Sequence, residues 1–147
     1  MTIHQLVVDL ENEPGRLFSV SEAIAAAGVT TYATTLSDGG GSGTARMLVS
    51  DARRARATVM GLDVPARTEE VLVIVIPDTP GSLAEVLEPI YDEYVNVLNL
   101  TACSLTDGRA VAVISFSDNR IAEGILREHG NEPIAPAELF PEPEDEA

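Results

Sequence analysis

The chain has 147 residues, of which 45% are hydrophobic and 22% charged, values typical of a globular protein with room for one domain or two small ones. Its formal net charge of -15 excludes nucleic acids and anionic membranes as expected partners, because Lys and Arg hold both of them. All nine basic residues are Arg, so Schiff-base chemistry and a P-loop lysine are excluded as well.

The first half of the chain predicts the element order βαββαβ. Apolar residues at helical spacing alternate with β-prone runs, Gly28 marks the end of the first helix, and Ser50-Asp51 offers a cap for the second. The predicted elements are a strand at 3–10, a helix at 15–27, strands at 30–36 and 44–49, a helix at 52–60 and a strand at 62–68.

The second half predicts the same order with stronger signals. Asp107-Gly108 is typical of a hairpin turn between two strands, and Pro89 is expected to kink or shorten the helix that contains it. The predicted elements are a strand at 71–76, a helix at 83–94, strands at 95–105 and 109–116, a helix at 118–129 and a short strand near 132–139.

The two halves form an internal repeat. Placing Pro14-Gly15 over Pro80-Gly81 superimposes Leu17 on Leu83, and also Val20 on Val86 and Val29 on Val95, all at an offset of 66 residues. We therefore expect an α+β fold of two ferredoxin-like βαββαβ units, with antiparallel sheets, helices on one face, and the units packed side by side. The expected boundaries are 1–68 and 69–139, followed by an acidic disordered tail at 140–147.

The repeated Pro-Gly turn between the first strand and the first helix indicates a ligand site. Unpaired backbone N–H groups at a helix start suit an anion such as a carboxylate, and a glycine lets a ligand approach closely. Acidic and polar groups just before the turn suit an ammonium group: Glu11, Asn12 and Glu13 in one copy and Asp78 and Thr79 in the other. A carboxylate receptor beside an ammonium receptor is typical of a site for a free amino acid.

The segments ENEPGRL and PDTPGSL, each in this position, resemble the signature loop of ACT domains, the small regulatory modules that bind amino acids. The similarity covers nearly the whole chain, which resembles the stand-alone tandem ACT proteins. In that family the ligand lies at an interface between ACT units, held by the loop of one unit and the start of the second strand of another. The resemblance implies these ligand-binding residues: Asn12, Glu13, Gly15, Arg16, Leu17, Thr30 and Thr31 in the first copy, and Asp78, Thr79, Gly81, Ser82, Leu83, Asn96 and Val97 in the second.

Each copy departs once from the family pattern of a helix-ending Gly followed two residues later by Asn. The first keeps Gly28 but has Thr30, and the second keeps Asn96 but has Tyr94 in place of the Gly, so the two sites are expected to be unequal. The resemblance implies a non-catalytic sensor that signals by changing the arrangement of its units. It also implies a homodimer, with a metabolic enzyme such as an aryl-acid CoA ligase as a regulated partner.

Two alternatives stay open. One is an acylphosphatase-like hydrolase on the same fold, for which Arg16 and Asn96 are the available Arg and Asn. The other is a structural subunit without a ligand. Arg53, Arg54 and Arg56 form a small basic cluster on the predicted second helix, and a solvated helix face is the expected role of this cluster.

The remaining signals predict no catalytic residues, no cofactor and no metal. Cys103 is the only cysteine and is expected to be a small buried thiol. His4 and His129 lack metal-ligand spacing, and His129 suits a helix end. With no long apolar run and no leader, the expected location is the cytoplasm.

Overall fold

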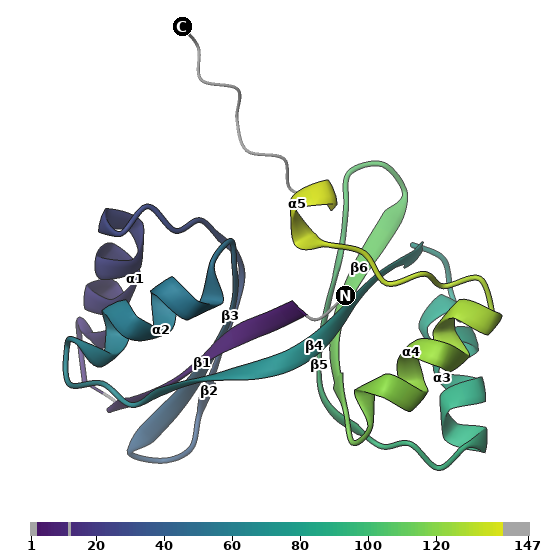
Figure 1. The fold of residues 1–147 in the computed structure, drawn as a ribbon, viewed down its shortest axis with the longest axis horizontal. Helices are drawn as coiled ribbons and strands as arrows, with labels where there is room; N and C mark the ends of the chain where they lie inside the picture. The colour runs from purple at the N-terminus through teal and green to yellow at the C-terminus, as the bar shows by residue number, and fades with distance from the viewer. Residues whose placement is uncertain (1–2, 12, 140–147) are drawn as a thin grey trace, which may run out of the picture. The chain divides into compact units, whose positions relative to one another are not determined.

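The computed structural model describes residues 3–11 and 13–139, which fold into two compact α+β units (Figure 1). His4–Glu69 form the first unit and the second begins at Glu70. Each unit has an antiparallel sheet with two helices on one face, as the sequence predicts. None of the helices in the described residues is long and apolar enough to cross a membrane.

The first unit has three full strands and two helices. They are β1 (Ile3–Glu11), α1 (Arg16–Ala26), β2 (Thr31–Asp38), β3 (Ser42–Val49) and α2 (Ala52–Met60). The strand β3 lies in the middle, paired with β1 through Leu6 and Met47 and with β2 through Thr34 and Met47. Alternate residues of β1 and β3 point to the helices, so that Leu6 and Met47 join Val20 and Ile24 of α1 in the core.

The second unit repeats this arrangement. Its elements are β4 (Ala66–Pro77), α3 (Ser82–Asp92), β5 (Val97–Ser104), β6 (Arg109–Phe116), α4 (Asn119–Glu128) and the short α5 (Pro136–Leu139). Here β6 is central, with Ile74 of β4 paired to Ala112 and Thr101 of β5 paired to Val113. Ile74 packs with Ile90 of α3 and Leu126 of α4 in a core separate from that of the first unit.

Small polar motifs confirm the alignment of the two halves. Thr30 and Ser50 are joined by two hydrogen bonds, from Thr30 N–H to Ser50 Oγ (2.9 Å) and from Ser50 N–H to the Thr30 carbonyl (2.9 Å). Asn96 and Ser117 form the same pair at 2.9 and 2.8 Å. Asp51 and Asp118 then cap α2 and α4 through their side chains. The duplicated unit therefore extends to individual hydrogen bonds.

The strand β4 differs from the sequence-based prediction. Separate strands were expected at 62–68 and 71–76, whereas the structure has a turn at 61–63 followed by one continuous strand from Ala66 to Pro77. Asp9 N–H donates to the Pro65 carbonyl (3.0 Å), which places the chain entering β4 beside β1. The boundary between the units falls inside β4, between Glu69 and Glu70.

The strand predicted near 132–139 is wrong. Residues 131–135 are irregular and the four-residue helix α5 follows. Ile134 N–H donates to the Val73 carbonyl (2.9 Å), so this segment starts to pair with β4. Pro133 and Pro136 have no N–H to donate, so the ladder cannot continue.

The structure also bears on three smaller expectations, which concern Cys103, Pro89 and His129. Cys103 is exposed, because on the edge strand β5 it lies on the sheet face away from the helices, so the expected buried thiol is wrong. Pro89 lies within α3, which at eleven residues is as long as α1, so no shortening is seen. His129 ends α4, with Nδ1 2.9 Å from the Ile125 carbonyl oxygen, as predicted. The tail expected at 140–147 lies outside the described residues.

Candidate ligand-binding loops

The first candidate site is the loop between β1 and α1. Gly15 is the N-cap of α1 with a φ angle of 86°, and the helix begins at Arg16. Pro14 therefore precedes the helix instead of occupying its first turn. A Cβ added to Gly15 would meet nothing within 4 Å, so the left-handed backbone and not crowding explains this glycine. Asn12, also expected in this site, lies outside the described residues.

The start of α1 presents unpaired backbone donors. Arg16 N–H reaches the Glu13 carbonyl at 3.4 Å, and Ser19 N–H bonds to Gly15 at 2.9 Å. Between them, the N–H groups of Leu17 and Phe18 make no hydrogen bond with any residue in the described part of the chain. Together with the positive end of the helix dipole, these two donors favour an anion.

Arg16 adds a positive charge at the same helix start. Its Nη2 lies 3.2 Å from Glu11 Oε2 and 3.4 Å from Glu13 Oε2, and all three side chains are 45% exposed or more. The two carboxylates expected to receive an ammonium group are thus already paired with Arg16. These ion pairs are exposed and therefore weak, so a zwitterion could replace them, with its carboxylate at Arg16 and its ammonium group at a glutamate.

A small cavity of about 80 Å³ opens beside this loop. It contains the predicted residues Glu13, Arg16 and Leu17 and also residues that the sequence did not single out. Its lining is Leu10, Glu11, Glu13, Arg16, Leu17, Leu36, Ser37, Asp38 and Gly43. Strand order could have indicated Leu36, Ser37 and Asp38, because β2 runs parallel to β1 and ends at the same end of the sheet, and Gly43 follows them at the start of β3. Arg16 also lines a second cavity of about 70 Å³, which includes Asp63 and Pro65.

The second candidate loop has the same backbone and different side chains. Gly81 is the N-cap of α3 with a φ angle of 85°, and the N–H groups of Leu83 and Ala84 lack hydrogen bonds to described residues. Ser82, at the position of Arg16, is only 7% exposed, and its Oγ lies 2.6 Å from Thr79 Oγ1. Asp78 is tied through its N–H to the Gly108 carbonyl (3.0 Å). This loop therefore offers an anion two amides but no cation.

The predicted strand-start residues do not join these loops within one unit. Glu11 pairs with Ser42 at one end of β3, whereas Thr31 pairs with Val49 at the other. Ser42 and Val49 are seven residue steps apart along β3, which corresponds to about 23 Å. Asn96 and Val97 lie equally far from their own loop, because Pro77 pairs with Arg109 and Val97 with Phe116. A site that includes both segments needs the strand start of another unit.

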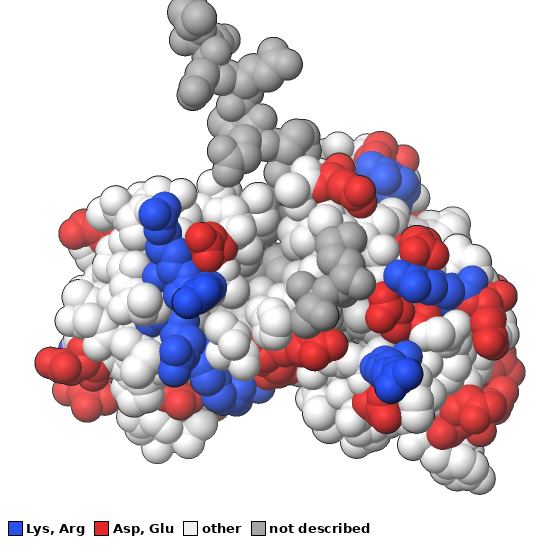
Figure 2. Space-filling view, in the orientation of Figure 1, with Lys and Arg blue, Asp and Glu red and all other residues white. Residues whose placement is uncertain are grey.

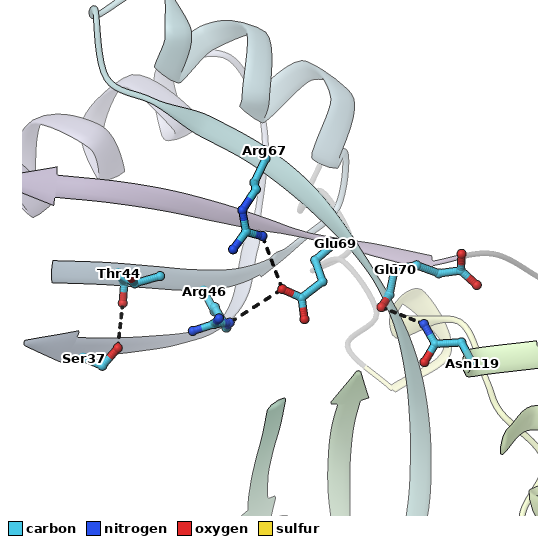
Figure 3. Close-up of polar contacts among 7 residues, drawn as sticks. All are labelled: Ser37, Thr44, Arg46, Arg67, Glu69, Glu70 and Asn119. Atoms are coloured by element: carbon cyan, nitrogen blue, oxygen red, sulfur yellow. Dashed lines mark hydrogen bonds and ion pairs between the residues drawn. The ribbon is translucent and has the colours of Figure 1, made fainter. Parts of the chain in front are cut away.

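A separate polar cluster lies at the end of the first unit (Figure 3). Glu69 Oε2 is 3.8 Å from Arg46 Nε and 3.5 Å from Arg67 Nη1. The side chains of Arg46 and Glu69 are 23% and 19% exposed, which makes this ion pair less accessible to water than the pairs of Arg16. The Nε of Arg46 and the Nε2 of Gln5 are buried without a hydrogen bond. The cluster is distant in sequence from both loops, and we assign it no ligand.

Comparison with known proteins identifies the family. A family model described as an ACT domain pair matches residues 1–132. The chain belongs to the ACT domain family. The chain is similar in structure to protein BT0572 from Bacteroides thetaiotaomicron, with 27% identity and a TM-score of 0.89, covering 96% of this chain and 97% of the other. None of the curated proteins compared matches the sequence.

Two further ACT-like structures have less similar sequences and show the fold alone. The ligand-free regulatory subunit of aspartate kinase from Thermus thermophilus has a TM-score of 0.66 and 15% identity, covering 88% of this chain and 91% of the other. Aspartokinase III from E. coli, solved in complex with lysine and aspartate, has a TM-score of 0.52 and 14% identity. There the match covers 86% of this chain and 31% of the enzyme.

The two ACT units of this chain thus share a backbone and differ in charge at the loop. In both, glycine with a left-handed backbone exposes two amides at a helix start. Only the first adds a guanidinium and two carboxylates beside a cavity. The second unit has Tyr94 in place of the glycine that ends the first helix of the unit. Tyr94 nevertheless adopts the left-handed backbone of that turn, with a φ angle of 56°.

Proposed function

We propose that this tandem ACT protein is a non-catalytic sensor that binds a free amino acid at the β1–α1 loop of its first unit. ACT domains are regulatory modules, and a structurally similar protein is the regulatory subunit of aspartate kinase. The observation that carries the proposal is the group formed by the free N–H donors of Leu17 and Phe18 and the guanidinium of Arg16.

The chemistry of the loop fits a zwitterion. The α-carboxylate would accept from the two amides at the start of α1, where the helix dipole adds to the attraction. The ammonium group would pair with Glu11 or Glu13 and would replace Arg16 as the partner of that carboxylate. Arg16 is then released to the carboxylate, so that each charged group keeps a partner of opposite sign.

The cavity in one unit is too small to enclose a whole ligand. Its volume of about 80 Å³ is well below the roughly 300 Å³ at which ligand pockets usually begin. We infer that a strand start from another ACT unit, with Thr30 and Thr31 or Asn96 and Val97, completes the site. Ligand binding then favours the arrangement of units that brings these segments together, and this arrangement binds or releases a partner enzyme.

The second loop is proposed as the weaker site. Gly81, Ser82, Leu83, Asp78 and Thr79 repeat the backbone of the first loop, but the hydroxyl of Ser82 is taken by Thr79. Without a cation, this loop should bind the same carboxylate less tightly or not at all. Binding of one amino acid per chain is therefore expected.

Calorimetry of the full chain against each of the twenty amino acids tests this function. We expect one or a few to bind with one site per chain, and Arg16→Gln to weaken binding at least about tenfold, the loss of one charge-assisted contact. Arg127→Gln is the matched control: Arg127 also lies between two carboxylates, Glu123 at 3.0 Å and Glu132 at 3.2 Å, and its side chain is 48% exposed.

Three results would decide against the proposal. They are no binding of any amino acid, equal loss in Arg16→Gln and Arg127→Gln, or hydrolysis of an acyl phosphate by the purified chain. The last result would favour the hydrolase, and the absence of both activities would favour a structural subunit.

A further inference from the structure

The two units differ greatly in charge. Residues 4–69 contain six Arg and eight Asp or Glu, a net charge of -2, whereas residues 70–147 contain three Arg and sixteen Asp or Glu, a net charge of -13. Figure 2 shows this asymmetry on one face, where blue side chains gather over the unit that contains α2 and red ones dominate the other unit. The basic side chains of the first unit therefore stand out on a chain whose second unit is strongly acidic.

The helix α2 carries the basic surface, and its charges are locally unfavourable. Arg53, Arg54 and Arg56 lie in its first half, where the positive end of the helix dipole favours acids, and its first turn contains none. Arg54 reaches the Ala27 carbonyl (3.5 Å), while Arg53 and Arg56 make no ion pair with any residue in the described part of the chain. Local rules are usually broken where a surface has a function.

A groove on the second unit has the complementary features. It has a volume of about 570 Å³, and it is lined by Glu93, Asp118, Arg120, Ile121, Gly124, Ile125 and Glu128. Glu93 and Glu128 are exposed and make no ion pair with a described residue. Ile121 is 49% exposed, and a Cβ on Gly124 would meet nothing within 4 Å, so another helix can approach α4 closely there.

The exposed face of α2 matches this groove in more than charge. Met60 is 46% exposed at the end of α2 and Ala57 is exposed one turn before it, so that small and apolar residues follow the arginines along the helix. A helix with charge at one end and an apolar residue at the other fits a groove with carboxylates beside an exposed isoleucine. Apolar contact and ion pairing then act together.

We propose that α2 of one chain docks in the groove between the end of α3 and α4 of a second copy. Arg53 and Arg56 pair with Glu93 and Glu128, and Met60 contacts Ile121. A second copy is the proposed partner because every chain carries both the basic helix and the acidic groove. Reciprocal docking forms the contact twice and closes a two-fold dimer. This interface is independent of the proposed amino-acid site, which involves neither α2 nor α4.

Sedimentation velocity of the full chain over a range of concentrations, in about 50 mM and about 500 mM salt, tests the docking. We expect dimers at low salt that dissociate at high salt, since exposed ion pairs are screened. Arg53→Glu/Arg56→Glu and Glu93→Arg/Glu128→Arg should each weaken association at least about tenfold, because like charges then face each other. An equimolar mixture of the two variants should associate again, since both of its contacts pair opposite charges.

Two controls keep the result specific. Glu22→Arg/Glu138→Arg changes two exposed acids elsewhere by the same total charge and should leave association unchanged. Thermal melts should show that all variants fold, and Arg53→Glu should not lower the Tm, because an acid in the first turn suits the dipole of α2.

Several outcomes would overturn the proposal. A chain that stays monomeric at every concentration, or a mixture that fails to associate, would exclude this interface. The interface would also be excluded if the dimer dissociated on neutralising Glu142, Glu144, Asp145 and Glu146 while Glu93→Arg/Glu128→Arg had no effect. The acidic C-terminal segment would then be the partner of α2.

Discussion

Tyr94 occupies, with a φ angle of 56°, the left-handed position that Gly28 occupies with a φ angle of 77° in the first unit. The hydrogen bonds around them are equivalent. Gly28 N–H donates to Ala25 and Val29 N–H to Ile24, as Tyr94 N–H donates to Tyr91 and Val95 N–H to Ile90. The turn is therefore kept although the glycine that relieves its strain is absent.

Tyr94→Gly should stabilise the protein. The left-handed backbone costs a residue with a Cβ about 1 kcal/mol, and a side chain that is 90% exposed contributes little packing in return. We expect the free energy of unfolding in urea to rise by about 1 kcal/mol. Tyr91→Gly is the control, because Tyr91 is 74% exposed within α3 and glycine in a helix should lower the free energy of unfolding by about 0.5 kcal/mol. Equal signs for the two variants would contradict this account.

The neighbouring residues Glu69 and Glu70 should respond differently to truncation. Glu69 pairs with two arginines, and its side chain is 19% exposed, whereas Glu70 is exposed and contributes only its backbone carbonyl to Asn119 Nδ2 (3.0 Å; Figure 3). Glu69→Ala leaves Arg46 partly buried without its carboxylate and should cost about 1 to 2 kcal/mol in urea unfolding, between the values for exposed and buried pairs. Glu70→Ala should change stability by less than about 0.5 kcal/mol.

The signature glycines should be needed for stability even without a ligand. Gly15→Ala and Gly81→Ala place a Cβ in open space but at φ angles of 86° and 85°, so each should lower the free energy of unfolding by about 1 to 2 kcal/mol. Gly124→Ala is the matched control: its Cβ also meets nothing, but its backbone is helical, and it should stabilise α4 by about 0.5 to 1 kcal/mol. If Gly15→Ala were neutral, the turn would not require a glycine. Loss of ligand binding in variants of Gly15 or Gly81 is therefore weaker support for a site than loss in Arg16→Gln.

Asp107 should titrate at low pH. The side-chain hydrogen bond from Arg109 Nε (2.8 Å) lowers the pKa of the Asp107 carboxyl below its usual value of 3.8. Because the folded pKa is below the unfolded one, the contribution to stability is present above about pH 4 and is lost as the pH falls through the folded pKa. NMR titration of the carboxyl carbon should show this low midpoint, and Arg109→Gln should raise it. An unchanged midpoint in that variant would exclude Arg109 as the cause.

The repeat and most elements could be predicted from sequence because the signals were local. Pro-Gly turns, the Asp107-Gly108 hairpin and the Ser-Asp caps each identify a position by its own chemistry, and their recurrence confirms the duplication. The exposure of Cys103 was not predictable in this way. It follows from the position of β5 at the sheet edge and from the sheet face that Cys103 occupies, both of which depend on pairing between distant segments.

The candidate site was predicted in part. Glu13, Arg16 and Leu17 line one cavity, because they come from a single loop whose turn the sequence specifies. Leu36, Ser37 and Asp38 were missed, since only the strand order brings the end of β2 to that loop. The two sites were expected to be unequal on the basis of Thr30 and Tyr94, but the sequence alone did not show that the hydroxyl groups of Thr79 and Ser82 bond to each other in the second loop.

The position of the unit boundary inside β4 has a practical consequence for dissecting this protein. Cutting the chain between Glu69 and Glu70 divides a twelve-residue strand, so that each fragment keeps only part of it. We therefore expect an isolated unit to be less stable than the same unit in the intact chain. Chimeric proteins are therefore better made by exchanging both ACT units together than by exchanging a single unit.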